Sequence, residues 1–184
     1  MVERLSDNLR PEKYDSINEV IKYLCTEHAS LPAFTSFGRT LTYGEVDDLS
    51  SRFASFLKTN TDLQAGDRIA LQLPNLLQFP IVFYGAMKAG LVVVNTNPLY
   101  TSEEMKHQFK DSGVKAIVIL ESFCKKLEGI LAETEITTVI IAKLGDLQPV
   151  LQKHMINFGA RYLKKLIPSY HLHGHFQIVY IHQK

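Results

Sequence analysis

The sequence contains no tryptophan and only two cysteines among its 184 residues. Cys25 and Cys124 are far apart in the chain and match no metal-ligand spacing. Two cysteines also cannot build the disulfide framework that stabilises many small secreted domains. We therefore expect both thiols to be reduced and buried, in a protein of the cytoplasm.

Neither sign of charge dominates the sequence. Twenty Lys and Arg residues against 19 Asp and Glu residues give a formal net charge of +1. This balance provides no general attraction to nucleic acid or to an anionic membrane. With 46% hydrophobic and 21% charged residues, the composition is that of a folded globular protein rather than of a disordered chain.

Long hydrophobic runs are absent as well. Residues 1–16 are polar and of mixed charge, and they contain no apolar core of a signal peptide. The best candidate for a membrane span, Leu76–Met87, is interrupted by Pro80 and is shorter than the roughly 18 residues that a span requires. We expect no transmembrane segment.

The sequence does contain a regular alternation of helix-like and strand-like segments. Strand, helix, strand at this spacing requires right-handed crossovers, so the fold class is predicted as α/β, with a doubly wound, mostly parallel sheet and flanking helices. The expected elements are a helix over Ile17–His28, a hairpin of Ala33–Ser36 and Thr40–Thr42 turning at Gly38-Arg39, helices over Val46–Leu57 and Ser122–Ala132, two helices ending at Met87 or Lys88 and near Gly113, and strands over Ile69–Leu73, Leu91–Asn95, Ala116–Leu120 and Thr138–Ile141.

Local signals mark the starts of three of these helices. Capping boxes of the form T-x-x-E begin at Thr42 and at Thr101. Asn75 is a candidate cap for the helix that follows the strand Ile69–Leu73. Pro80 falls inside that helix, close enough to its start that we expect a bend there.

The alternation weakens after Pro149, so we expect two parts. Residues 1–150 are predicted to form a partial N-terminal α/β subdomain, and residues 151–184 an irregular tail rich in basic residues and histidine. Within this tail, Val150–Ile167 has the pattern of a basic helix and Phe176–Ile181 that of a short strand.

Gly85 and Gly90 have the G-x-x-x-x-G spacing of a nucleotide phosphate loop. Such a loop needs Lys and then Ser or Thr after the second glycine, and it opens a helix. Here Leu91 and Val92 follow instead and lead into a strand. We interpret the glycines as part of a close helix-to-strand turn. The pattern G-x-G-x-x-G of dinucleotide-binding folds does not occur in the sequence.

A helix near the middle of the chain carries one candidate acid–base pair. His107 and Asp111 lie four residues apart, where a base and an orienting carboxylate can meet. No nucleophile accompanies them, and a solvated pair on the helix surface is the alternative that we favour. Glu103 and Glu104 lie in the first turn, where the helix dipole alone explains acidic residues.

Two features of the tail suggest binding. His171, His173, His175 and His182 have a spacing that could seat zinc or nickel, but no Asp, Glu or Cys accompanies them and short His tracts bind metals adventitiously. The segment Tyr162–Tyr170 mixes basic and apolar residues and could contact a membrane surface; a solvated segment is the alternative.

Several motifs, in a fixed order, resemble those of the AMP-forming adenylating enzymes, which include acyl-CoA synthetases, luciferases and the adenylation domains of peptide synthetases. Thr40–Val46 (TLTYGEV) resembles the motif L-T-Y-x-E-L, and Ala65–Leu73 resembles the G-D-x-V strand that follows it. Pro74-Asn75 with the later FYGAMKAG resembles P-N-x-x-x-F…A-x-x-G, and Asn97–Tyr100 resembles N-P-x-Y/F-T. The resemblance extends over roughly Met1–Leu172.

Within this family, the stretches NTNPLYT and LKKLIPSYHL are most similar to bacterial long-chain-fatty-acid–CoA ligases. The resemblance implies an N-terminal subdomain of an enzyme that uses ATP, Mg²⁺ and coenzyme A to activate a fatty acid. The phosphate loop, the magnesium-binding Glu, the ribose-binding Asp and the catalytic Lys of the family follow this region, and none has a counterpart here. We therefore assign no catalytic, cofactor-binding or metal-binding residue to this chain and expect no cofactor for it alone.

Our leading hypothesis is an N-terminal fragment of a fatty acid–CoA ligase, truncated before the phosphate loop and inactive alone. It would be cytoplasmic, with peripheral contact at the inner membrane left open, and would bind no nucleic acid. The segment HGHFQIVYIHQK departs from the family pattern, as a frameshift or premature stop in a longer gene would produce. The alternative is a non-catalytic binding module built on the same subdomain. An unrelated nucleotide-binding α/β domain is disfavoured because no phosphate-cradling loop is present.

Overall fold

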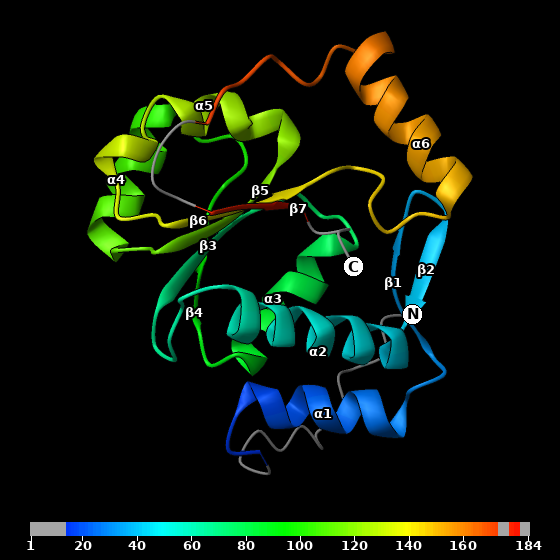
Figure 1. Ribbon diagram of the computed structural model, residues 1–184. Helices are drawn as coiled ribbons and strands as arrows, with labels where there is room; N and C mark the ends of the chain where they lie inside the picture. The colour runs from blue at the N-terminus through cyan, green and yellow to red at the C-terminus, as the bar shows by residue number, and fades with distance from the viewer. Residues whose placement is uncertain (1–13, 173–176, 181–184) are drawn as a thin grey trace, which may run out of the picture.

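A parallel sheet of five strands forms the centre of the protein, in the spatial order β4-β3-β5-β6-β7 (Figure 1). The computed structural model describes residues 14–172 and 177–180. The strands are β3 (Arg68–Gln72), β4 (Val92–Asn95), β5 (Ala116–Leu120), β6 (Thr138–Ala142) and β7 (Gln177–Tyr180). The chain passes from β3 outward to β4 and then returns to the other side of β3 for β5, so the strand order reverses between β3 and β5. The predicted doubly wound, mostly parallel fold is confirmed.

Helices cover both faces of the sheet (Figure 1). On one face lie α2 (Tyr43–Asn60) and α3 (Gln78–Lys88), and on the other α4 (Ser102–Ser112) and the short α5 (Cys124–Glu128). The strand β5 is buried at all five positions. Its alternate side chains enter the two hydrophobic cores, because neighbouring residues of a strand point to opposite faces. Double burial of β5 and β6 explains why these two strands are apolar runs.

A small antiparallel hairpin and the first helix lie beside the sheet and the helices that cover it. The helix α1 (Ile17–Glu27) precedes β1 (Pro32–Ser36) and β2 (Arg39–Thr42). The hairpin turns at Phe37 and Gly38, which both have positive φ angles of 50° and 78°. Two consecutive left-handed residues form the tight turn that suits the twist of paired strands. The predicted turn at Gly38-Arg39 is therefore wrong by one residue, and Arg39 pairs within β2.

The two predicted capping boxes are confirmed. The hydroxyl of Thr42 accepts a hydrogen bond from the Glu45 N–H, and the Glu45 carboxylate accepts one from the Thr42 N–H. Thr101 and Glu104 form the same reciprocal pair at the start of α4. Each box satisfies amide groups at the start of a helix that have no partner within it.

The predicted cap at Asn75 is wrong. The helix α3 begins at Gln78, with Leu77 in the capping position and no side-chain cap. Pro80 is the third residue of the helix. Its missing N–H therefore falls among the first four, which have no partner within a helix, and no helical hydrogen bond is lost.

The continuous helix predicted over Ser122–Ala132 is also wrong. The structure has a 3₁₀ turn η2 (Glu121–Phe123), then α5, then a second 3₁₀ turn η3 (Leu131–Glu133). Gly129 ends α5, and the Ile130 N–H bonds back three residues to the Leu127 carbonyl. Leu127 and Ile130 are both buried in the core, and the three-residue hydrogen bond between them is of the 3₁₀ type.

The tail contains a helix and a strand, as its pattern predicted. The helix α6 (Val150–Phe158) continues into a π turn, η4 (Gly159–Leu163), and so ends before the predicted Ile167. The strand β7 pairs in parallel with β6. The division into residues 1–150 and 151–184 stays a prediction, and β7 belongs to the same sheet as the strands of the first part. In the part of the chain that the structure describes, no helix is long and apolar enough to cross a membrane.

Candidate functional site

The reversal of strand order between β3 and β5 marks the position where doubly wound sheets usually bind ligands, outside the carboxyl ends of the strands. Two polar side chains lie there. Gln72 is the last residue of β3, and Glu121 directly follows β5. Both are buried, with exposed fractions of 0% and 4%. A buried amide and a buried carboxylate at this position make it the candidate site.

Gln72 has one polar atom that the described residues leave without a hydrogen bond. Its Nε2 donates to the Asn97 carbonyl at 3.4 Å and lies 3.3 Å from the Met105 sulfur. Its Oε1 has no hydrogen-bond partner among the described residues. A buried acceptor of this kind usually binds a water molecule or a ligand donor. The loop that follows β4, which contains Asn97, therefore forms one wall of the site.

Glu121 is held by two residues from the C-terminal part of the chain. Arg161, in the π turn, donates a short hydrogen bond to its carboxylate. The Tyr170 hydroxyl lies 3.3 Å from the same oxygen, Glu121 Oε1. The crevice beside this group has a free volume of only about 10 Å³, room for about one water molecule. Glu121 thus joins two segments of the chain, and the crevice that the described residues form beside it is too small for a substrate.

The start of α3 is the position at which a phosphate would bind if this edge held a nucleotide, since helix N-termini attract anions. Here it is closed: the exposed fractions of Leu76, Leu77 and Gln78 are 8%, 2% and 2%. The Leu76 N–H donates to the Pro74 carbonyl at 2.7 Å, and the Gln78 side chain donates to the Lys143 carbonyl at 2.8 Å. These residues therefore do not fit the phosphates of ATP or the Mg²⁺ that accompanies them.

The interpretation of Gly85 and Gly90 as structural is confirmed. A Cβ at Gly85 would lie 2.8 Å from both the Ser50 carbonyl oxygen and the Phe53 ring, so this glycine permits α2 and α3 to approach closely. Gly90 has a φ of +84°, and its carbonyl accepts a hydrogen bond from the Gly66 N–H at 2.8 Å. Gly90 forms the predicted turn from α3 into β4, whereas Gly85 lies within α3 and serves the contact with α2.

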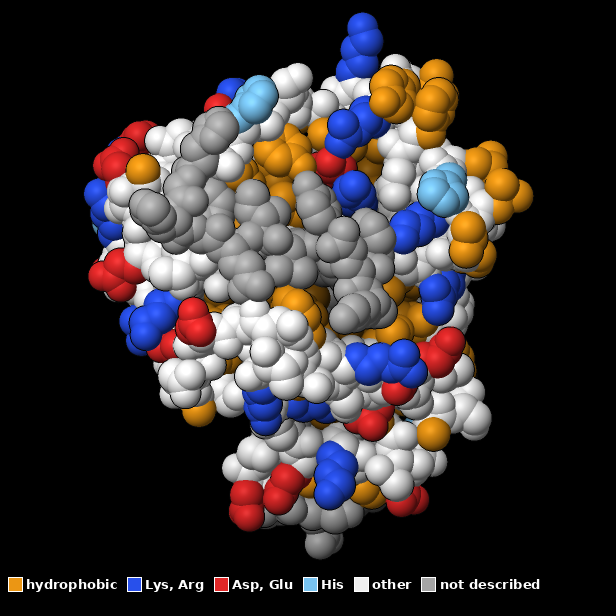
Figure 2. Space-filling view, viewed as in Figure 1, with side chains coloured by type: hydrophobic (Ala, Val, Ile, Leu, Met, Phe, Trp, Pro, Cys, Tyr) orange, Lys and Arg blue, Asp and Glu red, His pale blue; other side chains and the backbone are white. Residues whose placement is uncertain are grey.

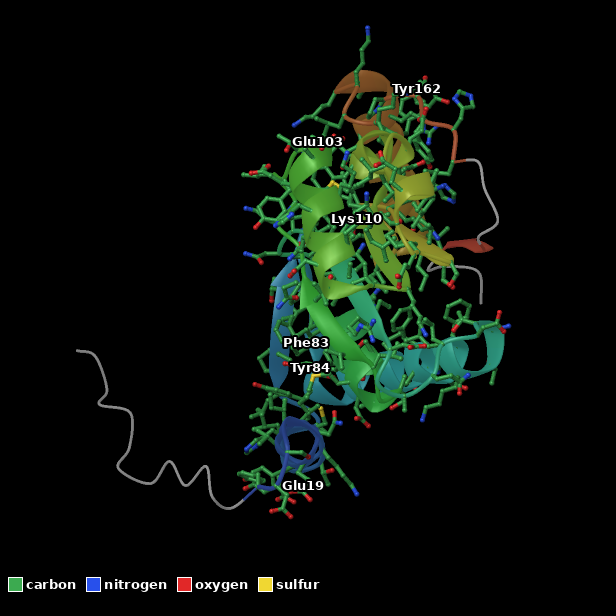
Figure 3. The ribbon with its side chains drawn as sticks, turned by 90° about the vertical axis from the view of Figure 1, so that its left-hand side faces the viewer. Glu19, Phe83, Tyr84, Glu103, Lys110 and Tyr162 are labelled. Atoms are coloured by element: carbon green, nitrogen blue, oxygen red, sulfur yellow. The ribbon has the colours of Figure 1, made fainter. Side chains whose placement is uncertain are left out.

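His107 and Asp111 are exposed residues of α4. Glu103 is exposed on the same helix (Figure 3). Within the described part of the chain, no hydrogen bond or ion pair joins His107 to Asp111. Glu103 pairs with Lys106 at 2.9 Å. Glu104 belongs to the capping box, and the hydrogen bond from the Thr101 N–H lowers the pKa of its carboxyl. This surface supports the solvated pair rather than an acid–base site.

Of the four tail histidines, only His171 belongs to the described residues; His173, His175 and His182 lie outside them. The His171 N–H donates to the Glu128 carboxylate at 2.9 Å, and this bond lowers the pKa of that carboxyl. Over residues 14–172 and 177–180, no group of three or more His, Cys, Asp or Glu side chains could hold a metal ion. The predicted metal site at the four histidines therefore stays untested.

Both cysteines are free and buried, as predicted. Their exposed fractions are 7% for Cys25 and 0% for Cys124. Burial raises the pKa of the Cys124 thiol to about 12, and the nearby Glu121 carboxylate adds to this shift. Burial also raises the pKa of Cys25. Neither thiol has the lowered pKa that nucleophilic cysteines require.

The sequence analysis missed Gln72 and Glu121. A signal for both was present, since each is a polar residue within or directly after an apolar strand, in IALQL and AIVILE. The partners of Glu121 gave no signal, because they lie 40 and 49 residues further along the chain.

Comparison with known proteins identifies relatives for most of the chain. The family model described as AMP-binding enzyme matches residues 22–166. A long-chain-fatty-acid–CoA ligase of Salmonella typhimurium strain LT2 is 39% identical over 164 residues, which are 89% of this chain and 29% of that protein. The ligase of the same name from Haemophilus influenzae is 40% identical over 164 residues, with the same two shares. The chain thus spans about three-tenths of the length of these curated relatives.

Solved structures agree with these matches. The N-terminal domain of FACL13 from Mycobacterium tuberculosis aligns with a TM-score of 0.64 and 28% identity, over 70% of this chain and 34% of that one. A benzoate CoA ligase from Burkholderia xenovorans LB400 aligns with a TM-score of 0.62 and 25% identity, over 67% of this chain and 25% of that one. The matched region is the N-terminal part of the ligases. The chain belongs to the family of AMP-binding enzymes and corresponds to the N-terminal part of its fatty acid–CoA ligases.

Proposed function

We propose that this chain serves as the N-terminal part of a long-chain-fatty-acid–CoA ligase and does not activate fatty acids by itself. One observation carries this proposal: identity of 39–40% to such ligases covers 89% of the chain but only 29% of the ligases. The chain therefore has the sequence of their scaffold without most of their length.

The parent reaction has two steps. A fatty acid carboxylate attacks the α-phosphorus of ATP and releases pyrophosphate, which leaves an acyl-adenylate; the thiol of coenzyme A then attacks the acyl carbon and releases AMP. The first step needs donors or cations already in place to stabilise negative charge on the phosphates. The 184 residues contain no phosphate-loop sequence, and Leu76 and Leu77 close the start of α3. ATP, Mg²⁺ and coenzyme A therefore belong, in this proposal, to a whole ligase.

A fatty-acid-dependent ATP–pyrophosphate exchange assay on the purified chain tests the inactivity. We expect no exchange above the level without fatty acid, while the Salmonella ligase, as the positive control, exchanges readily. Exchange that depends on both the chain and the fatty acid would overturn this part of the proposal.

A chimera tests the positive part. Residues 14–172 replace the matching segment of the Salmonella ligase, and the formation of long-chain acyl-CoA is measured. We expect activity, because the segment supplies the same sheet and helices. The same chimera carrying Gly85→Val is the matched negative control, since the larger side chain would force α2 and α3 apart.

The alternative, a non-catalytic interaction module, predicts a different result from the same chimera. A chimera that folds, as judged by circular dichroism, but makes no acyl-CoA would favour the module. For either role we propose a cytoplasmic location with peripheral contact at a membrane surface, through the C-terminal segment that includes Tyr162–Tyr170.

A further inference from the structure

The helix α6 and its π turn contact the rest of the protein through polar groups, one small buried residue and the partly buried Ile156. The Asn157 Oδ1 accepts a hydrogen bond from the Gly145 N–H at 2.9 Å, and Arg161 binds the Glu121 carboxylate. Among residues 150–163, which the structure describes throughout, Ala160 alone is buried. This orientation is the reverse of an ordinary surface helix, which turns its apolar side toward the core.

The opposite side of the same segment is apolar and exposed. Four of its apolar side chains are three or four residues apart and so lie along one face, which we call the α6 face. Its members, with their exposed fractions, are Leu151 (73%), Met155 (65%), Phe158 (57%) and Tyr162 (62%). The Phe158 and Tyr162 rings contact each other, with centroids 4.9 Å apart. Figure 2 shows this region at the upper right as orange side chains on the outer edge of the molecule. Exposed apolar side chains that gather on one face in this way often mark a binding site.

The charged residues of the segment that carries the α6 face are all basic. No Asp or Glu occurs from residue 147 to residue 184, although the whole chain is almost neutral. Lys164 and Lys165 are exposed beside the apolar side chains, and Lys153 is partly exposed. Basic residues flanking a face of Leu, Phe and Met are typical of helices that lie in the plane of a membrane surface. Acidic lipid headgroups attract such residues.

We propose that the α6 face docks onto the surface of an anionic lipid bilayer. The helix lies parallel to the membrane plane, Met155, Phe158 and Tyr162 enter the interface, and Lys164 and Lys165 contact the headgroups. This inference deepens the peripheral contact in the proposed function by naming its surface and its lipid class. It rests on the exposed surface of the described residues, and it does not depend on whether the chain takes part in forming acyl-CoA.

The absence of tryptophan provides a direct test. In Phe158→Trp the only indole of the protein reports on the α6 face. Ile17→Trp is the matched control, because Ile17 is also 57% exposed and lies on α1, at the opposite end of the molecule (Figures 1 and 3). Vesicles of phosphatidylcholine and phosphatidylglycerol in a two-to-one ratio should shift the emission of the Trp at position 158 to the blue. Brominated lipids should quench it. Emission from the Trp at position 17 should not change.

Loss-of-binding variants test the same surface without a probe. The double variant Met155→Gln/Phe158→Gln should weaken co-sedimentation with these vesicles by about tenfold or more, and so should Lys164→Gln/Lys165→Gln. Ile17→Gln, the control, should bind like the wild type. All these side chains are exposed, so circular dichroism should show unchanged folding.

Three results would overturn the proposal: no binding to anionic vesicles, equal binding to pure phosphatidylcholine, or binding that the Met155 and Phe158 substitutions leave unchanged. Light scattering can give a fourth. If the chain is a dimer that Phe158→Gln converts to a monomer, and if it does not bind vesicles, the α6 face is a contact with a second copy of the chain. An active chimera that does not bind vesicles would refute this inference and leave the proposed function standing.

Discussion

The substitution Gly85→Ala tests the contact that holds α2 against α3. Gly85 lies in the interior of α3, and a Cβ built there would lie 2.8 Å from the Ser50 carbonyl oxygen and from Cδ1 of Phe53. The carbonyl belongs to the backbone of α2, so it cannot rotate away as a side chain can. The two helices must therefore separate or shift to admit one methyl group.

The size of the effect follows from two opposing contributions. Overpacking a close contact costs about 1–3 kcal/mol, while Ala is favoured over Gly within a helix by about 1 kcal/mol. Separation would also strain the bonds of Lys88 Nζ to the Asp47 carboxylate at 2.7 Å and to the Ser50 hydroxyl at 2.8 Å. The two contributions leave a net loss of about 0–2 kcal/mol. The strain on the Lys88 bonds adds to it, so we expect Gly85→Ala to lower the free energy of unfolding by about 1–2 kcal/mol.

Urea unfolding followed by far-ultraviolet circular dichroism measures this change, since the chain has no tryptophan. The matched control is Gly129→Ala. Gly129 has a helical φ of −73°, and its added Cβ would meet nothing within 4 Å. This control should be neutral or up to about 1 kcal/mol more stable. If Gly85→Ala were as stable as the wild type with the same dependence on urea, the proposed close contact would be refuted.

Three further substitutions or reactions give separate tests. Thr101→Ala removes the capping box of α4 and should cost about 1 kcal/mol in the same urea assay. The pKa of Asp67 lies below its ordinary value, because the Gln64 N–H donates to its carboxylate at 2.9 Å and Lys115 pairs with it at 2.7 Å. The stabilisation of the folded state by the ionised Asp67 carboxylate is present above the ordinary pKa of a carboxyl group. It is lost as the pH falls through the lowered pKa of Asp67. Asp67→Asn should therefore lower the free energy of unfolding at neutral pH, by about 1 kcal/mol, and the difference should vanish in acid. Cys124 should react with a disulfide reagent only after urea unfolding, since burial raises its pKa to about 12; fast reaction of two thiols in the native protein would contradict this.

The fold could be predicted because its determining signals are local. The strand Ala116–Leu120 has the bounds that its apolar run predicted. The T-x-x-E spacings at Thr42 and Thr101 mark the starts of α2 and α4, because a capping box involves only four consecutive residues. Alternation of such segments then leaves few topologies other than a doubly wound sheet.

The predictions failed where burial outweighed local preference. Asn75 has the side chain of a good helix cap, but α3 begins three residues later. Leu76 and Leu77 fill the core at the end of β3, and a helix starting at Asn75 would turn them differently. The helix expected over Ser122–Ala132 ends at Gly129 and is flanked by two 3₁₀ turns. In both places the local pattern indicated a helix correctly but not its boundaries.

The candidate site was harder to predict, because its contacts join distant parts of the sequence. Arg161 appeared in the sequence as one of several basic residues on a surface helix, and nothing in its neighbourhood pointed to a buried carboxylate 40 residues earlier. Glu121 alone carried a signal. A carboxylate that directly follows five buried apolar residues lies at the carboxyl edge of the sheet, where its buried oxygens need hydrogen-bond donors. Sequence can therefore predict that such a partner exists. Which residue it is depends on how the turn after β6 positions α6, and that follows only from the packed structure.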